Sequence, residues 1–212
     1  MGFLLSGFVV SQNVKLQNAI ITANKAVEVA YKKMTVIKAS SVPDKCYTDF
    51  FGAGEAGRIN TVWQRMNMIQ YAMNSSFIRY NRNIGRPGTY AAAQRPSSGW
   101  SEKNVRQILD KGEFTMKIDD AFYGGNSDKR TAALTIVHEI SHLVANTDDV
   151  DCPWDNKACY ELARCRRLAT NYPDLAINNA DSYGYFVMAE YDTLLPSSNE
   201  SGDVENLSGL FA

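Results

Sequence analysis

The sequence has few histidines, few cysteines and no long hydrophobic run. Only two histidines occur in 212 residues, and no stretch of about 18 apolar residues is present that could form a transmembrane helix. The 22 basic and 23 acidic residues nearly cancel, so a net charge of -1 gives no bulk attraction to nucleic acid or to an anionic membrane. Internal repeats and low-complexity tracts are also missing, which excludes repeat arrays. We therefore expect an ordinary globular protein with no nucleic-acid partner and no membrane span.

The four cysteines form no Cys-x-x-Cys pair, which argues against a four-thiolate zinc site and a thioredoxin-type redox site. Cys152 and Cys159 bracket a short polar loop that a disulfide could close. The first ten residues make a poor signal peptide, because their apolar stretch is short and no basic residue precedes it.

Hydrophobic periodicity predicts a helix-rich chain with a small sheet. The first two long helices are expected to pack as a hairpin across a loop near residues 43–57. We predict one domain over 1–212, comprising an N-terminal helical part (1–75), a second part that holds both histidines (76–195) and a loose tail (196–212). The expected helices cover about 13–38, 55–74, 101–109, 128–145, 157–171 and 179–191, and the expected strands cover about 77–80, 89–91 and 114–118.

Both histidines lie in one pentapeptide, His138-Glu139-Ile140-Ser141-His142. Residues four apart on a helix project from one face, so the two imidazoles can bind one zinc ion. Glu139 lies beside them, where its carboxylate can take a proton from a zinc-bound water as that water attacks a carbonyl. Apolar residues flank the pentapeptide, as a buried helix requires. The pattern therefore predicts the two-histidine, one-glutamate arrangement of the zincin peptidases.

The third zinc ligand cannot be a histidine, because both histidines are already used. It must be a carboxylate or a thiolate. The candidates downstream are Asp148, Asp149, Asp151, Cys152, Glu161, Asp181 and Glu190.

The pentapeptide is followed by Thr147 and Asp149, then by Tyr160, and then by the run Asn179-Ala180-Asp181. Together these motifs resemble the aspzincins, the deuterolysin and peptidyl-Lys metalloendopeptidase family. The resemblance covers about residues 14–190 and is strongest at the zinc helix. It implies a Gly-Thr-x-Asp-x-x-Tyr-Gly element after the second histidine, whose aspartate is the third zinc ligand. It also implies that the tyrosine donates a hydrogen bond to the developing oxyanion.

The chain departs from this pattern at several places. Asn146 stands where the family has its first glycine, and Glu161 stands at the final one. Aligning on Thr147 makes Asp149 the third ligand, while counting from the second histidine in longer-looped members points to Asp151. We prefer Asp149, because it keeps the Thr-x-Asp spacing. Extra residues precede Tyr160, and a Cys152–Cys159 bridge would let them loop out while Tyr160 keeps its catalytic place.

The family's lysine-specific members line a pocket with acids after the Asn-Ala-Asp run. Asp181 matches one of these and is the predicted substrate-binding residue, whereas the second acid is replaced by Gly184. A single carboxylate still favours a basic substrate side chain, but less strongly. Asp181 could instead accept a hydrogen bond from a zinc-binding histidine, or cap a helix.

These observations lead to one main hypothesis. The chain is expected to be a helix-rich α+β, zincin-like zinc metalloendopeptidase with a long N-terminal helical hairpin, a small β-sheet and an active-site helix. One zinc ion is held by His138, His142 and Asp149, and Glu139 and Tyr160 are catalytic. A polypeptide substrate lies antiparallel to the strand near 114–118, and the protein is a secreted or exported monomer. The alternatives are an effector or toxin protease with a narrow target, exported by a specialised route, and a catalytically weak binding module on a zinc scaffold.

Overall fold

The computed structural model describes residues 4–74, 78–83, 90–93, 101–112, 114–124 and 128–194. The loose tail expected over 196–212 lies outside these residues. The helices are α1 (Val10–Ser40), α2 (Lys45–Phe51), α3 (Ala56–Asn74), α4 (Glu102–Lys111), α5 (Lys129–Ala145), α6 (Leu162–Asn171), α7 (Pro173–Ala176) and α8 (Ala180–Asp192). The strands are β1 (Leu4–Ser6), β2 (Arg79–Arg82), β3 (Ala91–Ala93) and β4 (Thr115–Ile118), and a short 3-10 helix covers Asp120–Tyr123.

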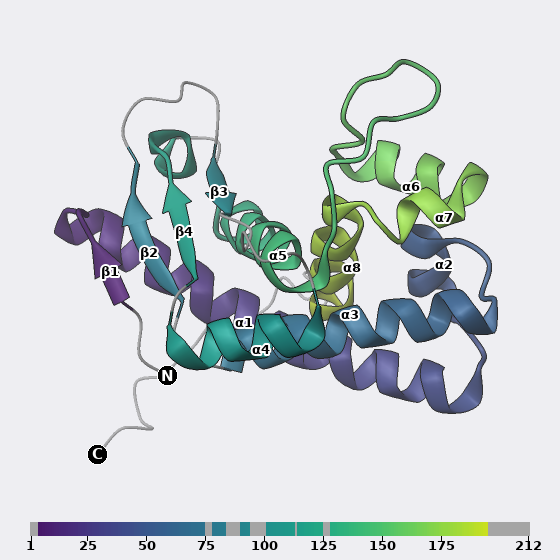
Figure 1. Cartoon of the computed structure of the whole chain (residues 1–212). Helices are drawn as coiled ribbons and strands as arrows, with labels where there is room; N and C mark the ends of the chain where they lie inside the picture. Colours follow the sequence, from purple (N-terminus) through teal and green to yellow (C-terminus); the bar gives the residue numbers. More distant parts are fainter. Residues whose placement is uncertain are drawn as a thin grey trace, which may run out of the picture.

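The predicted helix-rich fold with a small sheet is confirmed. Helices α1 and α3 pack against each other, as the hairpin hypothesis required, and α5 lies between the sheet and α8 (Figure 1). The seven-residue helix α2 was not predicted. It occupies the connection between α1 and α3, where the side chain of Asp44 caps it by accepting from the N–H of Tyr47. No helix in the described part of the chain is long and apolar enough to cross a bilayer.

The four strands form one mixed sheet in the order β1-β2-β4-β3. Pairing is parallel between β1 and β2 and between β2 and β4, and antiparallel between β3 and β4. The alternation predicted for β4 is confirmed, since Met116 and Ile118 are fully buried and Lys117 is exposed.

The expected role of β4 as the strand that receives the substrate is wrong. Both edges of β4 are already hydrogen-bonded, to β2 on one side and to β3 on the other. An extended substrate can add only to an open edge. The open edge on the side of α5 belongs to β3, which packs against that helix (Figure 1).

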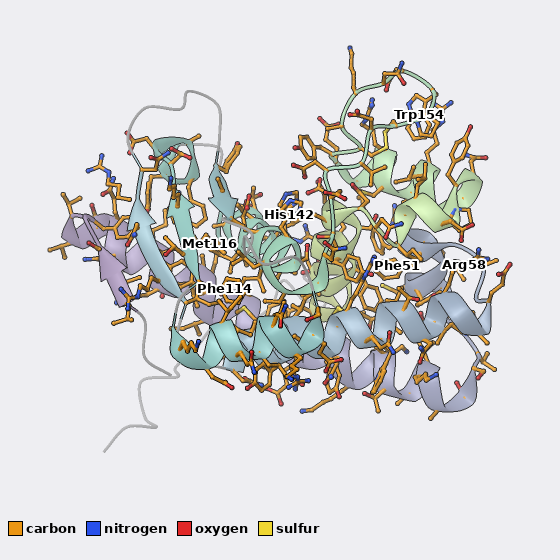
Figure 2. The ribbon with its side chains drawn as sticks, viewed as in Figure 1. Phe51, Arg58, Phe114, Met116, His142 and Trp154 are labelled. Carbon is orange, nitrogen blue, oxygen red and sulfur yellow. A yellow bond between two sulfur atoms is a disulfide. The ribbon has the colours of Figure 1, made fainter. Side chains whose placement is uncertain are left out.

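The hydrophobic core surrounds α5, whose apolar residues Ile136, Ile140 and Leu143 are fully buried. Figure 2 shows Phe114 and Met116 of the sheet region on one side of this helix and Phe51 on the other. The ring of Phe51 lies 4.9 Å from that of Tyr183. Since helix α5 is buried along most of its length, its histidines are carried on a rigid support.

Glu190 on α8 gives a prediction about stability. It is only 5% exposed, and among the described residues its Oε1 has no hydrogen-bond partner. Burial raises the pKa of Glu190, and this effect is larger than that of a hydrogen bond from Cys46, which lowers the pKa. Because the pKa is raised in the folded state, the carboxyl favours folding most below its ordinary pKa, and this contribution is lost as the pH rises through the raised value. Glu190→Gln should therefore stabilise the protein at pH 7 by about 1 kcal/mol, a rise in Tm of about 2–4 °C.

The measurement is the difference in Tm between Glu190→Gln and the unaltered protein at pH 7 and at pH 4. The gain should shrink at pH 4, where the native carboxyl is protonated. Glu55→Gln, which removes the charge of a side chain that is 74% exposed, is the matched control and should change Tm little at either pH. An equal gain at both pH values would contradict the assignment to the buried charge.

Candidate active site

Helix α5 carries the three residues of the predicted motif on one face. The Nε2 atoms of His138 and His142 lie 3.0 Å apart, and the two rings are nearly perpendicular, at 89°. The helix starts at an Asp128 side chain that accepts from the N–H of Thr131. It ends at Asn146, whose φ of 53° is left-handed. Asparagine tolerates this conformation, which explains how it can stand where the family pattern has glycine.

Each imidazole is held by its Nδ1 atom. Asp181 Oδ1 lies 2.6 Å from His138 Nδ1, and the carbonyl oxygen of Thr147 lies 2.8 Å from His142 Nδ1. These acceptors require a proton on Nδ1, so both Nε2 atoms are left with a lone pair when the rings are neutral. Burial lowers the pKa of His138, but the carboxylates of Asp149 and Asp181 outweigh it and raise the pKa to about 10.

Asp149 completes a group of three. Its Oδ1 lies 3.2 Å from His138 Nε2 and 3.3 Å from His142 Nε2. Burial tends to raise the pKa of Asp149, but hydrogen bonds with the two histidines dominate and hold it well below its usual range. The other candidate, Asp151, lies instead in a bridge with Ala158, and it is not part of the cluster of potential metal ligands.

This donor set fits a zinc ion. A tetrahedral zinc centre with ligand distances of about 2.0 Å has ligand-to-ligand edges of about 3.3 Å. The three separations within the group are 3.0, 3.2 and 3.3 Å. Two neutral imidazole nitrogens that face each other so closely repel one another, and a cation between them removes that repulsion. Two imidazoles and one carboxylate are also a combination that zinc accepts.

Glu139 lies beside this group without joining it. Its Oε1 is 4.0 Å from His138 Nε2, and the side chain is buried. Burial raises the pKa of Glu139, while the neighbouring histidines and a backbone hydrogen bond from Ala93 lower it. The N–H of Ala93 therefore ties the carboxylate to the edge of the sheet.

A cleft with a cavity volume of about 1020 Å³ opens over these residues, between β3 and the segment that carries Tyr160. Tyr160 is 43% exposed, and its ring centroid lies 6.1 Å from that of His138. Burial, and then Asp149, raise the pKa of its hydroxyl, so it stays protonated and able to donate. The cleft is lined by Tyr90, Ala91, Ala92, Ala93, Thr131, Leu134, Thr135, His138, Glu139, His142, Asp148, Asp149, Tyr160, Glu161, Asp181 and Tyr185.

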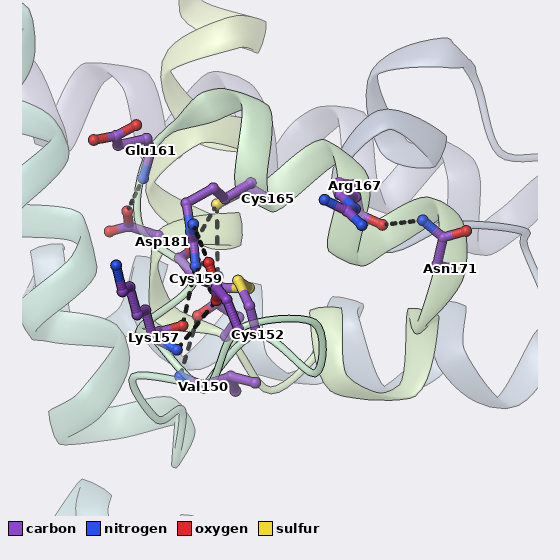
Figure 3. The surroundings of a disulfide bond; sticks show 12 residues. Val150, Cys152, Lys157, Cys159, Glu161, Cys165, Arg167, Asn171 and Asp181 are labelled. Atoms are coloured by element: carbon purple, nitrogen blue, oxygen red, sulfur yellow. Dashed lines mark hydrogen bonds and ion pairs between the residues drawn. A yellow bond between two sulfur atoms is a disulfide. The ribbon is translucent and has the colours of Figure 1, made fainter.

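The chain between Asp149 and Tyr160 forms a closed hairpin. The predicted Cys152–Cys159 disulfide is confirmed (Figure 3). Next to it, the N–H of Cys152 donates to the carbonyl of Lys157. The helix expected from residue 157 begins only at Leu162, because residues 157–159 belong to this hairpin. The extra residues therefore loop out from the site, and Figure 2 shows Trp154 among them, where its ring packs against Arg167.

Asn179 holds the base of this hairpin. Its Oδ1 accepts from the N–H of Val150 at 3.3 Å, and its Nδ2 donates to the carbonyl of Cys159 at 3.2 Å. The residue is fully buried. One side chain therefore joins the segment that bears Asp149 to the segment that bears Tyr160. This role of Asn179 was not predicted, although its place in the Asn-Ala-Asp run was a signal.

Asp181, the predicted substrate-binding residue, has both carboxylate oxygens engaged by the protein. Oδ1 meets His138 Nδ1, and Oδ2 accepts from the N–H of Glu161 at 3.1 Å. This geometry favours the alternative role, in which Asp181 orients a zinc-binding histidine. At Gly184, an added Cβ would lie 3.1 Å from Cγ of Leu134, so a larger side chain would require the Leu134 side chain to shift by a few tenths of an ångström.

Comparison with known proteins agrees with this geometry. Residues 36–188 match the model of the aspzincin family, described as lysine-specific metallo-endopeptidase. The chain is 26% identical over 176 residues to an extracellular protease of Aeromonas hydrophila, covering 82% of this chain and 44% of that protein. It is 27% identical over 169 residues to a peptidyl-Lys metalloendopeptidase of Pleurotus ostreatus, covering 77% and 85%.

A zinc peptidase from Grifola frondosa has the same fold, with a TM-score of 0.65 at 24% identity, over 87% of this chain and 98% of that one. Fold and site together define a zincin-type metallopeptidase. The chain belongs to the aspzincin family of zinc metalloendopeptidases. It spans less than half the length of the Aeromonas relative and most of the length of the Pleurotus one.

Proposed function

We propose that this chain is a zinc endopeptidase with one ion held by His138, His142 and Asp149. The observation that carries the proposal is the group of three ligand atoms that lie within 4.8 Å of one another, in an open cleft beside a buried glutamate. A bound zinc would polarise the peptide carbonyl and acidify a water molecule.

The remaining chemistry falls to two side chains. Glu139 accepts the proton of the attacking water and passes it to the leaving nitrogen, a role for which a carboxyl with a pKa raised by burial is suited. Tyr160 donates its hydroxyl hydrogen to the oxyanion that develops on the carbonyl oxygen. The ring of Tyr160 lies 6.1 Å from that of His138, and the influence of Asp149 on its pKa supports a place for the hydroxyl beside the ligand group.

The substrate backbone pairs with the open edge of β3. The carbonyl of Tyr90 accepts from the N–H of Asp119 on the β4 side, so antiparallel alternation directs the Ala92 groups to β4 and the Ala91 groups to the cleft. The N–H of Ala93 is bonded to Glu139. An extended peptide on this edge therefore lies directly beside the general base.

A preference for basic substrate side chains follows from the acidic cleft and from the names of the family and of the Pleurotus relative. We also infer export from the cell, since the Aeromonas relative is described as extracellular and a disulfide is stable in oxidising surroundings.

Metal removal tests the proposal. The purified full chain should contain about one zinc per chain and should cut an unfolded protein substrate at internal peptide bonds, as read by mass spectrometry. Dialysis against a chelator should abolish cleavage, and added zinc should restore it. If the zinc-loaded protein cuts no member of a broad peptide library, the activity proposed here is wrong, and a zinc-scaffold binding module is favoured.

A further inference from the structure

The cleft carries an excess of negative charge. Its lining residues include five carboxylates and no lysine or arginine within the described part of the chain. If a divalent ion occupies the ligand group and the histidines are neutral, five negative charges against two positive ones leave a formal charge of -3. A cationic side chain is therefore attracted to this cleft. The five carboxylates belong to Glu139, Asp148, Asp149, Glu161 and Asp181.

Most of these acids are already engaged by the protein. Asp149 faces both histidines, and Asp181 bonds to His138 and to a backbone N–H. Glu139 is buried beside the histidines, and Asp148 is held by its backbone in a bridge with Asn179.

The side chain of Glu161 is exposed at the cleft, and unlike Asp149 and Asp181 it faces no histidine. The charged group nearest to it in electrostatic influence is Arg164, whose pKa it raises. Between it and the other described residues there is no ion pair and no side-chain hydrogen bond. Its carboxylate is therefore open to a ligand.

The backbone of Glu161 is strained. Its φ of 73° and ψ of 151° lie in a region that essentially only glycine adopts without cost. The position also corresponds to the final glycine of the aspzincin pattern. A glutamate is thus retained where its own backbone would be relaxed by losing the side chain. Such strain persists at places where the strained residue serves a function.

In this conformation the backbone N–H and the carboxylate of Glu161 point in different directions. The backbone N–H is directed to Asp181, while the carboxylate points away from Asp181 and from the disulfide hairpin (Figure 3). Tyr185, another cleft residue, has its pKa raised to about 12 by burial first and then by several acids, Glu161 among them. Glu161 therefore lines the same cleft as Tyr160 and Tyr185.

We propose that Glu161 is a specificity-determining residue, whose carboxylate binds the positively charged side chain of a lysine or arginine in the substrate. This inference rests on the proposed endopeptidase function and assigns its basic preference to a residue that follows Tyr160 directly. The preference then does not require an acid at position 184, where this chain has Gly184.

The test compares two peptides that differ only at one residue, lysine in one and norleucine in the other. Cleavage of a lysine-containing library by the zinc-loaded full chain first locates the position where lysine matters. The ratio of kcat/KM for the lysyl and norleucyl peptides should then fall about fivefold in Glu161→Gln, the loss expected for one exposed ion pair. Glu102→Gln, which removes an exposed carboxylate outside the cleft lining, should leave the ratio unchanged.

The variant Glu161→Gly distinguishes the effect of the carboxylate on specificity from the effect of the backbone strain on stability. It should show the same fall in the ratio, and it should raise Tm by about 2–4 °C because the strain is relieved. An unchanged ratio in Glu161→Gln, with both peptides cut more slowly or equally well, would overturn the assignment. That result would leave the endopeptidase function intact, because the same assays report cleavage by the unaltered protein. Failure of the unaltered protein to cut either peptide or the library would instead refute the proposed function.

Discussion

Glu139→Gln is expected to reduce kcat for peptide cleavage by about 10³-fold while leaving the zinc content unchanged. General acid–base catalysis by one positioned side chain contributes 10²- to 10⁴-fold. Glutamine keeps the shape of the side chain and can still accept the backbone hydrogen bond of Ala93, but it cannot take a proton. Single-turnover cleavage of one peptide, with zinc measured on the same sample, checks the prediction.

Two features make this experiment decisive. Glu139 lies 4.0 Å from the nearest histidine Nε2, so its loss should not release the metal. Glu102→Gln is the control for removing one carboxylate elsewhere, and it should cleave at the normal rate. If Glu139→Gln keeps full zinc and more than a tenth of the normal kcat, another group is the general base.

Asp149→Asn is expected to weaken zinc binding by at least about 100-fold, since losing even a residue that orients a ligand costs 10- to 100-fold. The Oδ1 of Asp149 lies within 3.3 Å of both histidine Nε2 atoms, so the amide would remove the only negative charge among the three ligands. The two imidazoles would then bind zinc without charge neutralisation. Competition with a chromophoric chelator measures the affinity.

The chain contains a matched control two residues away. Asp151→Asn removes the same charge from the same loop, but Asp151 lies in the hairpin bridge with Ala158. It should keep normal zinc affinity and normal cleavage. The opposite result, with zinc lost in Asp151→Asn and kept in Asp149→Asn, would make Asp151 the ligand and would require the loop to rearrange when metal binds.

The helices were predictable because their patterns are local. The long helices α1, α3 and α5 were each predicted to within a few residues of their ends, and the short helix expected at 101–109 is α4. Strand order was not predictable in this way. Alternation in β4 shows which residues are buried, but it cannot show whether both edges are paired, because the partners come from distant segments. The three alanines of β3 also carry little strand signal.

The same distinction between local and long-range contacts applies to the site. The His138–His142 spacing is a local property of one helix, so the facing imidazoles could be predicted from sequence. The choice between Asp149 and Asp151 depends on how the hairpin closes, and the sequence therefore left it open. The role of Asp181 depends on how α8 packs on α5. Its hydrogen bond to His138 joins residues 43 positions apart, and a contact between such distant positions cannot be predicted from residue spacing.

The closed base of the hairpin has a consequence for how this protein can vary. The disulfide and the clamp at Asn179 fix the two ends of the segment, so the distance between Asp149 and Tyr160 does not depend on how many residues lie between Cys152 and Cys159. A change in the length of the loop between Cys152 and Cys159 should therefore leave the geometry of the metal centre unchanged. Trp154 packs against Arg167 of α6, so a change in loop length is expected to be tolerated best at the exposed residues Asn156 and Lys157.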